Sequence, residues 1–228
     1  MKRVERLGEA VAPDGTVLVL YRHDGAYVIR ANGQELMSTR RHHSEEVLAD
    51  VACAPLRERA GARVLIGGLG LGFTLRAALR SLGPDARVAV AEIMEEIIRW
   101  NQDPTYDLAA DALRDPRVEL HHDDVANVLQ ANAGGFDAIM LDVDNGAAPL
   151  TTRGNALLYD ADGIRRAAAA LRPGGRLAYW AAGSEPGFET ALRRAGMAVE
   201  VVRARAHPGL RSWHAIYVAR RADAPAPG

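Results

Sequence analysis

The sequence predicts an α/β protein with a doubly wound, mostly parallel, seven-stranded sheet and a small antiparallel β element in front of it. Three observations lead to this fold class. Before residue 55, short alternating apolar runs are separated by an Asp-Gly and an Asn-Gly turn. From Ala62 onward, short apolar runs alternate with segments of helical period. Near the C-terminus, two strand-like runs follow each other with no helix between them.

The composition is that of an ordinary folded protein. Of the 228 residues, 48% are hydrophobic and 25% are charged, and 28 basic residues nearly balance 29 acidic ones. This balance argues against a broad nucleic-acid-binding surface. No apolar run approaches the roughly 18 residues that span a bilayer, and the N-terminus lacks the apolar core of a signal peptide. We therefore expect a cytoplasmic protein with neither a nucleic-acid nor a membrane partner.

The first unit, residues 1–55, is expected to contain the antiparallel β element and one helix. Alternating apolar residues and tight turns extend from Thr16 to Ser38. A helix follows, with Ser44 as its candidate N-cap. A boundary near this point leads to a larger α/β domain over residues 56–221. Residues 222–228 are rich in Pro and Ala and are expected to form a disordered tail.

The larger domain is expected to contain five parallel strands, four intervening helices and a closing antiparallel pair. The predicted strands are Arg63 to Ile66, Arg87 to Ala91, Val118 to His121, Ala138 to Leu141 and Arg176 to Trp180. The predicted helices are near residues 75–81, 94–101, 124–131 and 160–171. The antiparallel pair is Ala198 to Arg205 and Ser212 to Val218. Open parallel sheets bind ligands at the carboxyl ends of their strands, so the informative residues should follow each strand.

The first of these strand ends is rich in glycine. Gly68, Gly70 and Gly72 lie between an apolar strand and a helix. Glycine allows the backbone to turn tightly and to approach a ligand closely, and the following helix offers free N–H groups. This placement favours a nucleotide or nucleoside site over a merely tight connection.

Carboxylates follow the next two strands. Glu92 ends the second strand, 24 residues after Gly68, which is where an acidic residue accepts hydrogen bonds from a ribose diol. Asp124 follows the third strand. It either accepts a hydrogen bond from an adenine amino group or caps the next helix, and both roles are compatible.

The fourth strand end carries the best catalytic candidate. Asp142 directly follows the apolar run that ends at Leu141, so its side chain should lie at the mouth of the pocket. Asp144 lies two residues further on and shares a face with Asp142 in extended chain. No further ligands stand at chelating spacing, so we do not expect a metal site.

These residues resemble the spermidine synthases, the polyamine aminopropyltransferase family within the class I S-adenosylmethionine-dependent methyltransferase fold. The resemblance extends over nearly the whole chain. It is carried by Val64 to Arg76, Glu92, Asp115 to Asp124, Phe136 to Asp142, Leu158 to Asp160 and Leu171 to Arg176.

The resemblance implies roles for the candidate residues. Glu92 would hold the ribose hydroxyls, Asp124 would hold the adenine amino group, and Gly68 to Gly72 would line the methionine-derived part of the nucleoside. Asp142 would orient and deprotonate the attacking amine. The co-substrate would be S-adenosylmethionine or its decarboxylated form, the partner a small-molecule amine or another small acceptor, and the assembly a homodimer.

Three departures from the family weaken the expected polyamine site. The aspartate that grips the aminopropyl ammonium in the family is Leu71 here. The second acid of the family's Asp-x-x-Asp-Pro motif is replaced by Asn145 or displaced to Asp144. The acidic polyamine-binding segment begins with basic residues here, although Glu45 remains a candidate amine contact.

Three functions are therefore compatible with the sequence. The leading one is a transferase that moves an aminopropyl-type alkyl group to an amine. A methyltransferase acting on a small molecule is the first alternative, with Arg40 or Arg41 pairing with a carboxylate. A noncatalytic nucleoside-binding protein is the second.

Overall fold

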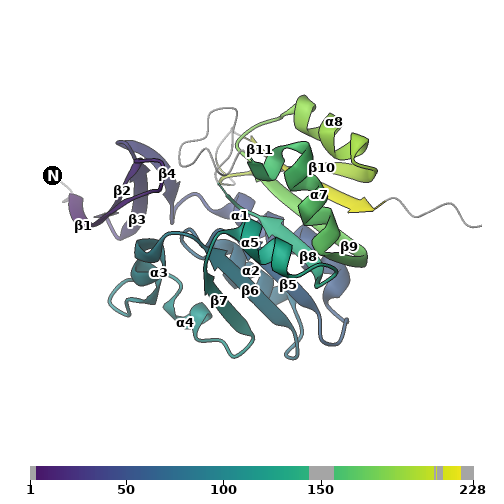
Figure 1. The fold of residues 1–228 in the computed structure, drawn as a ribbon. Coiled ribbons are helices and arrows are strands. Elements are labelled where there is room, and N and C mark those ends of the chain that lie inside the picture. The colour runs from purple at the N-terminus through teal and green to yellow at the C-terminus, as the bar shows by residue number, and fades with distance from the viewer. Residues whose placement is uncertain (1–3, 144–156, 208, 210–212, 222–228) are drawn as a thin grey trace, which may run out of the picture.

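The computed structural model describes residues 4–143, 157–207, 209 and 213–221. It contains a small antiparallel sheet and a large mixed sheet that is covered by helices on both faces (Figure 1). The predicted fold class is confirmed. Among the described residues, no helix is long and apolar enough to cross a membrane.

The small sheet, sheet A, is a meander with the strand order β1-β2-β3-β4. Asp24 and Asn32 adopt positive φ at the tight turns that the sequence predicts. The strands are β1 (Val4–Val11), β2 (Val17–His23), β3 (Ala26–Ala31) and β4 (Gln34–Ser38). Strand β1 lies before the predicted β element and was missed, since Glu5, Arg6 and Glu9 interrupt its apolar alternation.

The large sheet, sheet B, has the strand order β10-β11-β9-β8-β5-β6-β7. The five strands from β9 to β7 are parallel, and β10 and β11 form the predicted antiparallel pair at one edge. The bounds are β5 (Arg63–Gly67), β6 (Arg87–Glu92), β7 (Val118–His122), β8 (Phe136–Leu141), β9 (Leu171–Ala181), β10 (Met197–Arg205) and β11 (Trp213–Arg221).

Both faces of sheet B are apolar, as expected of a doubly wound sheet. Val64 and Ile66 of β5 belong to one buried cluster with α1 to α4, whereas Leu65 faces the opposite cluster with α5, α7 and α8. The helices are α1 (His43–Cys53), α2 (Phe73–Ser81), α3 (Glu95–Gln102), α4 (Ala110–Leu113), α5 (Val125–Ala131), α7 (Ala161–Ala170) and α8 (Pro186–Arg194), and a 3₁₀ turn, η1, spans Ala54–Leu56.

The start of α1 differs from the prediction. His42, not Ser44, precedes the helix, and Ser44 lies inside its first turn. The Ser44 hydroxyl donates to the Glu45 carboxylate at 2.6 Å and lies 2.9 Å from Nδ1 of His214, so it does not cap the helix. Helix α1 packs against α2 and β9 of the large domain. The predicted tail, residues 222–228, lies outside the described residues.

Candidate active site

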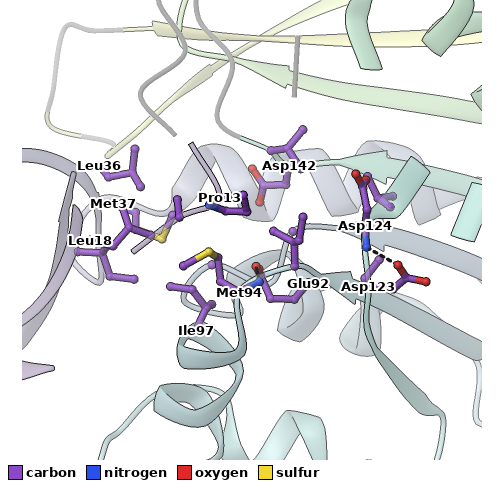
Figure 2. Close-up of a pocket in the computed structure, with 18 of the residues that line it drawn as sticks. Pro13, Leu18, Leu36, Met37, Glu92, Met94, Ile97, Asp123, Asp124 and Asp142 are labelled. Carbon is purple, nitrogen blue, oxygen red and sulfur yellow. Dashed lines mark hydrogen bonds between the residues drawn. The ribbon is translucent and has the colours of Figure 1, made fainter. Parts of the chain in front are cut away.

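A cavity of about 360 Å³ lies between sheet A and the carboxyl ends of β5, β6, β7 and β8. In Figure 2, apolar side chains of sheet A form one side and Asp123 and Asp124 the other, with Glu92 and Asp142 between them. The lining residues are Ala12, Pro13, Asp14, Leu18, Ile29, Leu36, Met37, Gly68, Gly70, Ala91, Glu92, Ile93, Met94, Ile97, Asp123, Asp124, Val125, Asp142 and Val143.

The glycine-rich loop separates into a ligand side and a packing side. Gly68 and Gly70 line the cavity. Gly68 has φ +92°, and a Cβ there would lie 2.6 Å from the carbonyl oxygen of Asp142, so only glycine fits. Gly72 also has positive φ, but a Cβ there would meet Ala109 at 2.3 Å, and Gly72 does not line the cavity. Glycine is therefore needed at position 72 because the chain packs closely against Ala109.

Glu92 is buried at the end of β6, and its carboxylate is fixed by the backbone. Oε2 accepts from the Leu69 N–H at 2.9 Å, and Oε1 accepts from the Met94 N–H at 2.8 Å. Burial raises the pKa of Glu92, while these backbone hydrogen bonds favour the ionised form. Each oxygen retains a second lone pair, so the carboxylate can still accept from a vicinal diol in the cavity.

Asp124 caps α5, which confirms one of its two expected roles. Its Oδ1 accepts from the Ala126 N–H at 2.8 Å. The side chain also lines the cavity, so an oxygen remains available for a ligand amino group. The neighbouring Asp123 accepts from the Asp124 N–H at 2.7 Å and from Asn127 at 2.8 Å.

Asp142 lines the cavity just beyond the end of β8. Its N–H donates to the Gly67 carbonyl at 2.9 Å, and its Oδ2 accepts from the Thr74 hydroxyl at 2.6 Å. Burial raises the pKa of Asp142 to about 6, and the Thr74 hydrogen bond opposes this rise. The group is therefore ionised at neutral pH and is a better proton acceptor than an ordinary aspartate.

The described charged residues of the cavity wall are all acidic. They are Asp14, Glu92, Asp123, Asp124 and Asp142. No Arg, Lys or His is found among the described lining residues. Arg40 and Arg41, which the methyltransferase alternative assigned to a carboxylate, lie elsewhere: Arg40 pairs with Asp24 and Arg41 with Glu35. Neither arginine lines the cavity, so the structure gives that assignment no support.

Other predicted residues lie away from the cavity or outside the described part of the chain. Glu45 is on the first turn of α1 and does not line the cavity. Asp144 and Asn145 fall outside the described residues. Leu71 is buried in the apolar core with only 4% exposed. Within the described ranges, no three His, Cys, Asp or Glu residues are close enough to hold a metal ion.

Two sets of site residues were missed from the sequence. Thr74 was not singled out from the sequence, although its position two residues after Gly72 was a usable signal. The apolar wall, with Leu18, Ile29, Leu36 and Met37, comes from the antiparallel β element, which the sequence did not connect to the ligand. Only the tertiary packing of sheet A over the glycine loop reveals it.

No protein-family model matches the chain. Polyamine aminopropyltransferases from two strains of Leptospira biflexa serovar Patoc are each 32% identical to it over 116 residues. The match covers 50% of this chain and spans only 38% of the relative's length. Over that half, the chain is similar in sequence to polyamine aminopropyltransferases. The resemblance stated from the sequence is confirmed.

Solved structures of spermidine synthases share the fold of this chain. A spermidine synthase in complex with the transition-state analogue AdoDATO superposes with a TM-score of 0.72 at 18% identity, covering 97% of this chain and 74% of the other. The enzyme from Thermotoga maritima gives 0.71 at the same identity and coverage. A probable spermidine synthase from Corynebacterium glutamicum gives 0.66 at 18% identity, covering 96% and 81%.

Proposed function

We propose that this protein is an aminopropyltransferase that uses decarboxylated S-adenosylmethionine and a small amine. The observation that carries the proposal is the cavity wall: its described charged residues are all carboxylates, and one of them, Asp142, is suited to accept a proton. The similarity to polyamine aminopropyltransferases over half of the chain supports it.

The charge of the cavity favours the decarboxylated donor. That donor carries a sulfonium and an ammonium and no carboxylate, so every charge it brings is attracted to the wall. Intact S-adenosylmethionine would also place a carboxylate among five acidic side chains with no described cation to pair it. Methyl transfer from the intact donor is for this reason the less favoured function.

The nucleoside is expected to lie along the acidic side of the cavity. We assign the ribose hydroxyls to Glu92, because its carboxylate is held in a fixed orientation by two backbone N–H groups. The adenine amino group is assigned to Asp124, and the sulfonium end to the surface of Gly68 and Gly70. Asp144 and Asn145, which the sequence suggested as amine contacts, remain predictions.

Asp142 would prepare the acceptor for attack. An alkylamine with a pKa of about 10.4 enters as an ammonium and must lose one proton before it becomes a nucleophile. Asp142 takes that proton. The free nitrogen lone pair then forms a bond to the carbon next to the sulfonium, the carbon–sulfur bond breaks, and methylthioadenosine leaves with the bonding pair. The raised pKa of Asp142 brings its proton affinity about 3 kcal/mol closer to that of the amine.

Calorimetric titration with each donor tests the proposal. We expect the decarboxylated donor to bind at least tenfold more tightly than intact S-adenosylmethionine, a difference of about 1.4 kcal/mol. We also expect methylthioadenosine release with a panel of amines. Tighter binding of the intact donor with release of S-adenosylhomocysteine would instead establish methyl transfer, and binding of neither donor would favour the noncatalytic alternative.

We further infer a cytoplasmic homodimer formed through sheet A. Within the described chain, β1 and β4 each pair with a strand on one side only, and Val4 and Val11 of β1 are 58% and 60% exposed. Pairing of two copies would cover such an edge. Sedimentation at micromolar concentration tests this inference, and a monomer would contradict it.

A further inference from the structure

Asn101 is a buried polar residue that joins helix α3 to the glycine-rich loop. It lies one residue before the end of α3, and 1% of its surface is exposed. Its Nδ2 donates two hydrogen bonds, one to the Ile97 carbonyl at 2.9 Å and one to the Gly70 carbonyl at 2.8 Å. The first bond lies within the helix, one turn back. The second reaches the loop between β5 and α2 that lines the cavity.

The two partners of Asn101 determine which way its amide faces. Both are carbonyl oxygens, so the NH2 group faces them and Oδ1 faces elsewhere. Oδ1 has no hydrogen-bond partner within the described chain. Asparagine is therefore used here for its two donors. Leucine, which is of similar size, supplies no donor, and aspartate would place a carboxylate against two acceptors.

The Gly70 carbonyl depends on this contact. In the described part of the chain, no other group donates a hydrogen bond to it. Gly70 has φ +53°, and glycine leaves the backbone free to adopt several conformations at this position. A carbonyl that faces a buried side chain and has no donor is costly, so without Asn101 the loop would turn this carbonyl toward the cavity. Asn101 therefore selects one of the loop conformations that glycine allows.

The same loop also holds Glu92. One residue before Gly70, the Leu69 N–H donates to Glu92 Oε2 at 2.9 Å. The loop is thus held from two sides, at Leu69 by the end of β6 and at Gly70 by α3. Because a planar peptide group joins Leu69 to Gly70, a displacement of Gly70 is passed on to Leu69. The orientation of the Glu92 carboxylate in the cavity is therefore linked to Asn101.

We propose that Asn101 is a positioning residue for the nucleoside: it presets the glycine-rich loop and, through Leu69, the Glu92 carboxylate before the aminopropyl donor binds. This inference rests on the proposed function, in which Glu92 holds the ribose hydroxyls. Asn101 does not line the cavity, so it acts on the ligand through the loop. A preset loop needs no rearrangement on binding, which increases affinity for the aminopropyl donor and leaves the transfer step at Asp142 unchanged.

Threonine separates the two hydrogen bonds of Asn101. A threonine hydroxyl in a helix donates to the carbonyl four residues back, so Asn101→Thr keeps a bond to Ile97. The hydroxyl lies one bond closer to the backbone than the asparagine amide and gives up the contact with Gly70. Asn132, at the end of α5, offers the matched control, because its Nδ2 also donates four residues back, to the Val128 carbonyl at 2.8 Å. Asn132 does not line the cavity.

Calorimetry with methylthioadenosine measures the effect without turnover. We expect Asn101→Thr to raise the Kd about tenfold, because the loop must then be ordered on binding. Asn132→Thr should leave the Kd unchanged. In the transfer assay, the KM for the decarboxylated donor should rise by a similar factor in Asn101→Thr, while kcat and the KM for the amine stay near wild type. A purely structural role would lower stability without this separation of KM from kcat.

A double-mutant cycle tests the route through Glu92. Glu92→Ala removes the carboxylate that the loop holds. In that background, Asn101→Thr should cause little further loss of affinity for methylthioadenosine, because the two residues act on the same contact. Equal losses with and without Glu92 would overturn the proposed route.

A measurement on the wild type covers the case in which Asn101→Thr does not fold. The side-chain amide protons of Asn101, followed by NMR, should be protected from solvent exchange already in the ligand-free protein. Protection that arises only with methylthioadenosine, or an unchanged Kd in folded Asn101→Thr, overturns this inference alone. Wild-type protein that binds neither methylthioadenosine nor the decarboxylated donor overturns the proposed function as well.

Discussion

An acidic residue lies near each end of strand β8, and the protein surrounds the two with different partners: Asp137 is buried near its start, and Asp142 is half-buried just beyond its end. Asp137, near its start, has a side chain that is 1% exposed and that is surrounded by donors. Arg59 and Arg172 each lie 2.8 Å from it, and the Arg63 N–H donates to it at 2.8 Å. Its charge is therefore paired with two arginines of the protein.

Asp142, just beyond the other end of β8, has a single described side-chain donor, the Thr74 hydroxyl. Within the described chain no arginine or lysine pairs with it, and burial raises its pKa to about 6. The charge of Asp142 is therefore left for a substrate cation to neutralise.

The difference follows the geometry of a parallel sheet. Ligands bind at the carboxyl ends of the strands, where loops diverge and leave space, whereas the amino ends are closed by packing. A compensated carboxylate stabilises the fold, and an uncompensated one costs stability that binding or catalysis can use. The number of cations around a buried acid therefore distinguishes the structural residue from the functional one.

The largest effect should come from removing the uncompensated charge. Asp142→Asn is expected to lower kcat/KM for aminopropyl transfer by about 10³-fold, because general bases contribute factors of this order. Stability should be unchanged or slightly higher, since Asn still accepts from Thr74 and no buried charge remains. Methylthioadenosine release and thermal unfolding measure the two effects. A variant that retains full activity would remove Asp142 from the mechanism.

Removing the charge of Asp137, which is paired with arginines, should lower stability and leave activity unchanged. Asp137→Asn is expected to lower the free energy of unfolding by about 3 kcal/mol, because the charge-assisted hydrogen bond from Arg172 and the ion pair with Arg59 are weakened. Activity per folded molecule should persist. Urea unfolding and an activity assay at low temperature measure both quantities. A loss below about 1 kcal/mol would contradict the structural role assigned to Asp137.

Much of the fold and the acidic site follow from local sequence patterns. Apolar runs alternating with helical segments predict sheet B, and the strand ends direct attention to Glu92, Asp124 and Asp142. These predictions succeed because strand, turn and helix periods are properties of neighbouring residues. Local patterns do not predict every role correctly. Gly72 was expected to line the ligand site, but it packs against Ala109 and not against the cavity.

The remaining contacts join residues that are distant in the sequence. Ser44 and His214 are 170 positions apart, and Arg63 and Asp137 are 74 apart. No local pattern indicates such pairs. The N-cap prediction for Ser44 was wrong. The helix begins one residue earlier, at His43, and the Ser44 hydroxyl contacts Glu45 and the distant His214 instead of the helix backbone.

A smaller effect tests the one donor that Asp142 has. Thr74→Val should raise the pKa of Asp142 further, since the lost hydrogen bond stabilises the ionised carboxylate. Activity of the wild type should fall as the pH drops below about 6, where Asp142 becomes protonated. In the variant this acidic limb should move to higher pH by roughly one unit. Thr190→Val on exposed α8 is the control. An unshifted profile would show that Thr74 does not tune Asp142.

The smallest effect on stability should come from removing one of the two arginine charges that pair with Asp137. The Arg59 side chain is 48% exposed, so solvent already screens its ion pair, and Arg172 stays 2.8 Å from the same carboxylate. Arg59→Gln is therefore expected to cost about 1 kcal/mol of unfolding free energy, clearly less than Asp137→Asn. Urea unfolding of Arg59→Gln, Arg172→Gln and the double variant measures this redundancy. We expect the double variant to lose more than the sum of the single losses, because only then does Asp137 become a buried acid with no cation, as Asp142 is.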